Sequence, residues 1–86
     1  MSALPEHIPV PCLNGTSREE LVGQRRRLLD ALNGALRALQ DAAPHGRDFQ
    51  TGGSYPLAVA AHVRRYTALG SLIVEVQEEL ESIQSR

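Results

Sequence analysis

The strongest constraint in this sequence is a seven-residue repeat that runs through its C-terminal part. Two interleaved rows of mostly apolar residues recur at this spacing: His62, Leu69, Val76 and Ile83 in one row, and Val59, Tyr66, Ile73 and Leu80 in the other. Such a repeat puts both rows on one face of an α-helix and favours packing against a second helix. We expect a helix over residues 55–85, with Ser54 or Tyr55 as its N-cap and Pro56 in its first turn.

A second helix is expected over residues 17–43. Its start is marked by Thr16 with Glu19, or by Ser17 with Glu20, since either pair can form a capping box. Two apolar rows then follow at helical spacing: Leu21, Leu28, Leu32, Ala35, Leu39 and Ala42 in the first, and Val22, Leu29, Leu36 and Ala43 in the second. These rows span a wider arc than one partner helix buries, so we expect this helix to touch two neighbours.

The segment that joins the two helices, residues 44–54, is longer than a helix–helix connection requires, and loops of this kind are often functional. Residues 1–16 contain three prolines and no helical period, which is typical of an extended arm. The predicted fold is therefore all-α: an extended N-terminal arm over residues 1–16, followed by an antiparallel two-helix hairpin over residues 17–86.

Self-association is expected because a chain of 86 residues buries a small core. Cys12 is the only cysteine and the three histidines are widely spaced, so neither an intrachain disulfide nor a metal site is expected. A homo-oligomer remains as the source of stability, and the sequence does not distinguish a dimer from a trimer or a higher assembly. The expected oligomer interface consists of apolar positions on both helices: Leu29, Leu36, Leu72, Ile73 and Val76.

The charge distribution differs between the two ends of the expected hairpin. A net charge of −1 argues against a general binder of nucleic acids or anionic membranes. The arginine run at 25–27 faces four glutamates of the returning helix, and we expect an ion-pair lattice there that stabilises by about 0.2–1 kcal/mol per exposed pair. All basic residues are arginine, which reflects either codon usage in a GC-rich genome or a need for planar guanidinium donors.

The loop end, by contrast, has an excess of arginine over carboxylate and contains all three aromatic residues of the chain on its side. Arginine, backbone N–H groups at a helix start and aromatic rings suit a phosphorylated, nucleotide-like ligand. The candidate ligand-binding residues at this end are His45, Arg47, Asp48, Phe49 and Tyr55. An antiparallel assembly would bring residues from the start of the first helix to them: Asn14, Thr16, Ser17 and Arg18. The alternative is that Arg47 and Asp48 pair locally and only brace the loop.

No catalytic pattern is recognisable in this sequence. It has no nucleophile elbow, no plausible pair of carboxylates and no phosphate-binding loop, so we expect a protein that is not an enzyme and has no cofactor. His62 on the apolar row is interpreted as a core histidine, and Cys12 as an inert thiol. The chain has no stretch long and apolar enough to span a membrane and no recognisable signal peptide, so we expect a cytoplasmic protein.

Two short motifs resemble those of small uncharacterised bacteriophage and prophage proteins. Residues 13–17 read LNGTS before the first helix, and residues 42–49 read AAPHGRDF after it, where those proteins have an APNGRDYY-like loop. His45 and Phe49 stand where asparagine and tyrosine are commoner. The resemblance implies a phage-encoded accessory protein acting in the cytoplasm of the host cell, in a class that includes inhibitors of host defence.

Two functions are consistent with these observations. The first is an oligomer that sequesters an anionic nucleotide-like ligand, such as an immune signal of the host. The second is a protein-interaction module that inhibits a host defence protein directly or takes part in phage assembly. Its expected partners are therefore copies of itself, a small phosphorylated ligand and a host protein.

Overall fold

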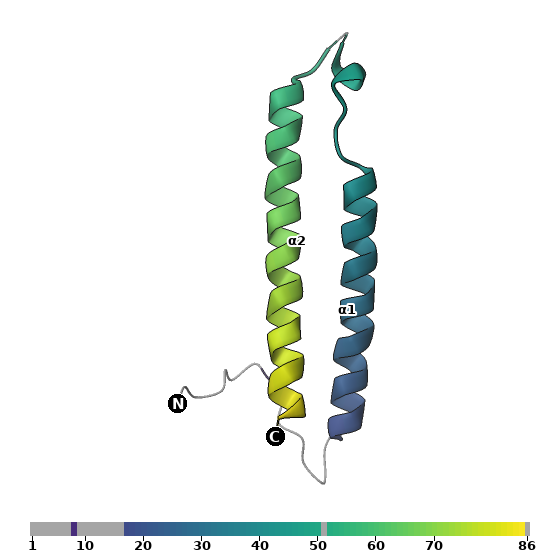
Figure 1. Ribbon diagram of the computed structural model, residues 1–86, viewed down its shortest axis with the longest axis vertical. Helices are drawn as coiled ribbons and strands as arrows, with labels where there is room; N and C mark the ends of the chain where they lie inside the picture. The colour runs from purple at the N-terminus through teal and green to yellow at the C-terminus, as the bar shows by residue number, and fades with distance from the viewer. Residues whose placement is uncertain (1–7, 9–16, 51, 86) are drawn as a thin grey trace, which may run out of the picture.

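The computed structural model describes residues 8, 17–50 and 52–85 of the chain. Two long helices, α1 (Arg18–Asp41) and α2 (Tyr55–Gln84), run antiparallel side by side, and a short 3-10 helix, η1 (Gly46–Phe49), lies between them in the chain (Figure 1). The described part contains no strand. The prediction of an all-α hairpin of two long helices is confirmed, while the predicted N-terminal arm lies outside the described residues except for Ile8.

Side-chain caps set where both helices begin. The Ser17 hydroxyl accepts a hydrogen bond from the Glu20 N–H at 3.1 Å, and the Ser54 hydroxyl accepts one from the Leu57 N–H at 3.3 Å. Each cap satisfies a donor that the first helical turn leaves without a backbone partner. The helices start at residues 18 and 55, as the capping patterns indicate, and α1 ends two residues before its expected end at residue 43.

The contact between α1 and α2 follows the predicted heptad repeat of α2. Among the described residues, the side chains buried at this core are Leu21 from α1 and Ile73, Val76 and Ile83 from α2. Further along α2, Leu69 and His62 are half-buried and Tyr66 is 41% exposed. Burial is therefore strongest near the open end of the hairpin and weaker toward the loop.

On α1, the residues that face α2 come from both of the rows expected from the sequence. Leu28 is 45% exposed and Ala35 and Ala42 are also exposed, whereas the second row is buried or half-buried. The contact row alternates spacings of three and four residues: Val22, Arg25, Leu29, Leu32, Leu36, Leu39 and Ala43. Leu28, Ala35 and Ala42 are each one position before a residue of that row, about 100° away around the helix, and lie beside the contact. Leu21 also precedes the row by one position, but it is buried at the open end of the hairpin.

Considerable apolar surface remains outside the hairpin contact. Large apolar side chains are exposed on α2 at Leu57 (72%), Val63 (56%), Val74 (50%) and Leu72 (43%). Among the described residues, no helix has the length and hydropathy that a membrane span requires. An exposed apolar band on a helical surface is a usual mark of a protein interface.

Candidate functional site

The candidate site lies at the loop end of the hairpin, where the chain passes from α1 through η1 to α2 (Figure 1). His45 is extended, and its carbonyl oxygen accepts a hydrogen bond from the Asp48 N–H at 3.0 Å, which closes the turn of η1. The side chains of His45, Arg47 and Asp48 are all exposed. This turn was not anticipated from the sequence, and it presents the three polar residues of the candidate site to solvent.

Two aromatic rings order the loop. The centroids of Phe49 and Tyr55 lie 5.9 Å apart with the ring planes tilted by 50°, a common geometry for an aromatic pair. Gly53 has a φ of 77°, and a Cβ atom there would lie 3.2 Å from Cδ1 of Phe49. The Phe49 ring therefore packs against the glycine backbone, while Tyr55 keeps 40% of its surface exposed.

The helix start offers fewer free donors than the sequence suggests. Among the first residues of α2, Pro56 has no N–H group, and the Leu57 N–H donates to the Ser54 hydroxyl. The Ala58 N–H donates to the Ser54 carbonyl oxygen at 3.0 Å. Within the first turn of α2, Tyr55 is therefore the one residue whose N–H forms no hydrogen bond in the described part of the chain. Because the helix start offers so few free N–H groups, most of the site's capacity to bind anions lies in its arginine side chains.

The arginines of the loop end have no carboxylate partner within the described residues. Arg37, Arg47, Arg64 and Arg65 are all exposed, as are Asp41 and Asp48. No ion pair joins Arg47 to Asp48 in the part of the chain that the structure describes, so the local pairing that we considered as an alternative is not formed there. The loop end therefore presents guanidinium groups whose hydrogen-bonding capacity is unused.

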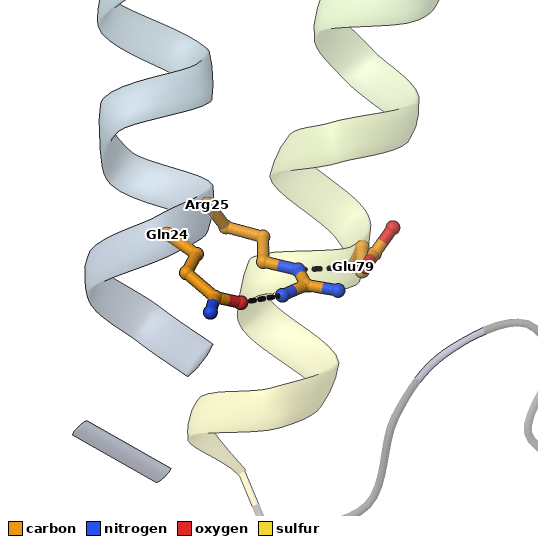
Figure 2. Close-up of polar contacts among 3 residues, drawn as sticks. All are labelled: Gln24, Arg25 and Glu79. Carbon is orange, nitrogen blue, oxygen red and sulfur yellow. Dashed lines mark hydrogen bonds and ion pairs between the residues drawn. The ribbon is translucent and has the colours of Figure 1, made fainter. Parts of the chain in front are cut away.

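At the opposite end, one arginine is paired with a carboxylate. Nε of Arg25 donates to Oε1 of Glu79 at 2.9 Å, and its Nη1 donates to Oε1 of Gln24 at 2.7 Å (Figure 2). Arg26 and Arg27 are exposed, and among the described residues they form no ion pair. Instead of the expected lattice of ion pairs, the described residues form one ion pair between these segments. Arg25 faces α2, whereas Arg26 and Arg27 are rotated from it by about 100° and 200° around α1 and so face away from α2.

The other candidate residues are distributed as follows. Ser17 and Arg18 lie at the start of α1, with Ser17 engaged as the N-cap, and Asn14 and Thr16 lie outside the described residues. The length of α1, about 36 Å at 1.5 Å per residue, separates Ser17 and Arg18 from the loop end within one chain. These two residues are thus at the opposite end of the hairpin from the candidates of the loop, and only a second chain can bring them together.

The expected interface residues also fall into two groups. Ile73 and Val76 are buried between the two helices of the hairpin, and Leu29 and Leu36 are half-buried there. Leu72 is 43% exposed. The hairpin itself uses the first four, so the apolar side chains that are free to meet another molecule lie beside that contact.

The remaining histidine of the helices is part of the hairpin contact. His62 is half-buried, and its ring centroid lies 6.4 Å from that of Tyr66. The Tyr66 hydroxyl accepts a hydrogen bond from Nε2 of Gln40 at 3.4 Å, which links the two helices on that side. Within the described ranges, no group of three or more His, Cys, Asp or Glu side chains is arranged to hold a metal ion.

Comparison of this chain with protein-family models, curated proteins and solved structures finds no match.

Proposed function

We propose that this protein is a non-enzymatic binding protein that, as an oligomer, sequesters an anionic nucleotide-like ligand at the loop end of its hairpin. The observation that carries this proposal is the unequal use of arginine along the molecule. Arg25 is neutralised by Glu79 at one end, whereas Arg47 and three further arginines at the loop end have no carboxylate partner among the described residues. Planar guanidinium groups bind phosphate through paired hydrogen bonds.

The aromatic pair supports a ligand that also contains a base. Tyr55 is 40% exposed and stands beside Phe49, which its contact with Gly53 holds in place. An exposed aromatic ring offers a face on which a nucleobase stacks, a contact that contributes about 1–3 kcal/mol per base in other proteins. The resemblance of the LNGTS and APHGRDF segments to phage proteins is our reason for proposing a signal of host defence as this ligand.

The test is a calorimetric or thermal-shift titration of the full chain with cyclic dinucleotides and ADP-ribose derivatives. Arg47→Ala is expected to weaken binding at least tenfold, since about 1.4 kcal/mol of lost interaction corresponds to that factor. Arg26→Ala is the matched control, because this arginine is equally exposed but lies at the opposite end. Silence across the whole panel, with the oligomer intact, would reject the proposal.

A second candidate function is a protein-interaction module, and a specific surface favours it. Val63, Tyr66 and Val74 are 56%, 41% and 50% exposed and lie along one side of α2. If a host protein binds there, Val63→Asp should abolish its stoichiometric co-purification from host lysate, while Arg47→Ala should leave it unchanged. Loss on Arg47→Ala and retention on Val63→Asp would instead favour the loop end.

A further inference from the structure

One surface of the hairpin combines exposed alanine and leucine residues of both helices. On α1, these residues are Leu28, Ala31, Ala35, Ala38 and Ala42, and all five are exposed. On α2, the corresponding row is Ala61, Arg65, Ala68, Leu72 and Glu75, of which only Ala61 is half-buried. Both rows alternate spacings of three and four residues, so each row forms a continuous stripe along its helix. We call the two stripes together the leucine–alanine face.

The hydrogen bond between Gln40 and Tyr66 shows that these stripes share one surface. Gln40 and Tyr66 meet on one side of the contact between the helices. By helical spacing, the stripe through Ala35 lies on the other side of α1, and the stripe through Leu72 lies on the other side of α2. Both stripes therefore lie on the surface opposite to the Gln40–Tyr66 hydrogen bond.

The contacts between the helices also fix which levels of the two stripes coincide. Arg25 contacts Glu79, and Gln40 contacts Tyr66. In both pairs the two residue numbers add up to about 105, so a residue of α1 lies at the same height as the α2 residue whose number completes this sum. Ala35 is therefore level with residue 70. Ala35 is the centre of the α1 stripe, since Leu28 and Ala42 lie seven residues to either side of it. Residue 70 lies midway between Ala68 and Leu72 of the α2 stripe, and also midway between Arg65 and Glu75.

The charged residues of the α2 stripe match those of a second copy that lies antiparallel and is centred on the same level. Arg65 lies five residues before position 70 and Glu75 lies five residues after it. Both are exposed, and neither has an ion-pair partner within the described residues. If a second copy lies antiparallel on this face, Arg65 of each copy stands opposite Glu75 of the other. Two equivalent ion pairs then form, as a two-fold axis requires.

We propose that the leucine–alanine face binds a second copy of this chain, related by a two-fold axis that crosses both helices at the level of Ala35. The α1 helices of the two copies then pack antiparallel through small alanine side chains, which allow close approach, with Leu28 of one copy level with Ala42 of the other. The α2 helices pack through Ala68 and Leu72, flanked by the two Arg65–Glu75 pairs. The result is an antiparallel four-helix bundle.

This assembly deepens the proposed function and rests on its oligomeric part, but not on its ligand. Residue 18 lies 17 residues before Ala35, and by the sum of about 105 the level 17 residues beyond Ala35 is that of residue 53, directly before α2. Arg18 of one copy is therefore level with the loop end of the other copy. Two groups of candidate residues that one hairpin holds apart share one end of the bundle.

The first test uses cysteine cross-linking without ligand. In a Cys12→Ser background, Ala35→Cys lies on the two-fold axis and is expected to give a disulfide-linked dimer on mild oxidation. Thr67→Cys is the matched control, since this exposed position of α2 lies on the opposite surface of the hairpin. Linking of Ala35→Cys no faster than Thr67→Cys, or a solution mass equal to the 9.4 kDa of one chain, would overturn the proposal.

The second test addresses direction and register. Arg65→Glu is expected to raise the dimer dissociation constant about tenfold or more, since it replaces two ion pairs by two repulsions, and adding Glu75→Arg is expected to restore it. Arg37→Glu, on the opposite surface of α1, should leave dissociation unchanged. Failure of the double variant to recover would overturn the antiparallel register. A dimer that forms without binding any nucleotide would reject the ligand part of the proposed function and leave this assembly standing. A monomer that binds nucleotide would reject this assembly and the oligomeric part of the proposed function, and would leave nucleotide binding standing.

Discussion

Arg25 and Glu79 form an ion pair inside the contact between the two helices, with 2.9 Å between Nε and Oε1. The two side chains keep only 19% and 18% of their surface exposed. Arg25 occupies a position of the α1 contact row that leucine or valine fills elsewhere. The Glu79 carboxylate on α2 compensates the largely buried charge of this arginine. Because the pair forms only in one alignment of α1 and α2, it fixes that alignment near the open end of the hairpin.

Glu79→Ala is expected to lower the free energy of unfolding by about 1–2 kcal/mol, because the guanidinium of Arg25 remains partly desolvated without its partner. Arg26→Ala removes a neighbouring exposed arginine and should change stability by less than about 0.5 kcal/mol. Urea denaturation at one fixed protein concentration measures both, since self-association makes stability depend on concentration. Equal losses in the two variants would show that the pair adds nothing. The double variant Arg25→Leu with Glu79→Leu should be close to neutral.

Adjacent positions of α2 allow a test of the hairpin core. Ile73 is 7% exposed and faces α1, whereas Val74 is 50% exposed and faces away. Ile73→Ala is expected to cost about 2–4 kcal/mol of stability, because it leaves a cavity between the helices. Val74→Ala should be neutral or slightly stabilising, since alanine has the higher helix propensity. Thermal and urea unfolding followed by circular dichroism compares them, and similar losses would contradict the placement of Ile73 in the core.

The helices and their starts were predictable because local signals determine them. Ser17 and Ser54 cap the helices as short-range patterns indicate, and the heptad row of α2 identifies its contact face without knowledge of the partner. The face of α1 was harder to predict. Arg25 interrupts the true contact row, and alanines at 35 and 42 made the neighbouring row look equally apolar. Which row faces α2 depends on the tertiary contact with Glu79, which no local pattern reveals.

The candidate site was predictable in composition but not in geometry. The excess of arginine near the loop is visible in the sequence. The 3-10 turn of η1 and the packing of Phe49 on Gly53 are not, although the paired glycines at 52 and 53 beside aromatic residues were a signal for a tight turn. The proposed meeting of Ser17 and Arg18 with this end requires a second chain, and a single sequence contains only indirect signs of such an assembly.

Ser17 provides a test of the α1 start. Its hydroxyl accepts the Glu20 N–H, so Ser17→Ala is expected to destabilise the protein by about 1 kcal/mol. Ser17→Gly should cost only a few tenths of a kcal/mol, because glycine leaves the helix end accessible to water. Hydrogen exchange of the first-turn amides, together with urea unfolding, measures the difference. If alanine and glycine behave alike, the hydroxyl is not the cap that stabilises this end.

The adjacent glycines Gly52 and Gly53 are expected to respond to alanine with opposite signs. Gly53 has a φ of 77°, a left-handed conformation that costs a non-glycine residue about 1–2 kcal/mol, and an added Cβ would press on the Phe49 ring. Gly53→Ala should therefore destabilise the protein. Gly52 has no atom within 4 Å of an added Cβ and does not have a positive φ, so Gly52→Ala should stabilise by up to about 1 kcal/mol through the unfolded state.

A Phe49→Ala variant separates the two causes of the stability loss expected for Gly53→Ala, which are the backbone strain and the contact of the added Cβ with the Phe49 ring. In a Phe49→Ala background the ring contact is gone, so the cost of Gly53→Ala should fall but remain above zero because the backbone strain persists. Urea unfolding of the four chains that combine the two substitutions gives the coupling energy directly. A coupling energy of zero would mean that the ring does not rest on the glycine. The ordering of Phe49 and Tyr55 by this contact would then lose its support.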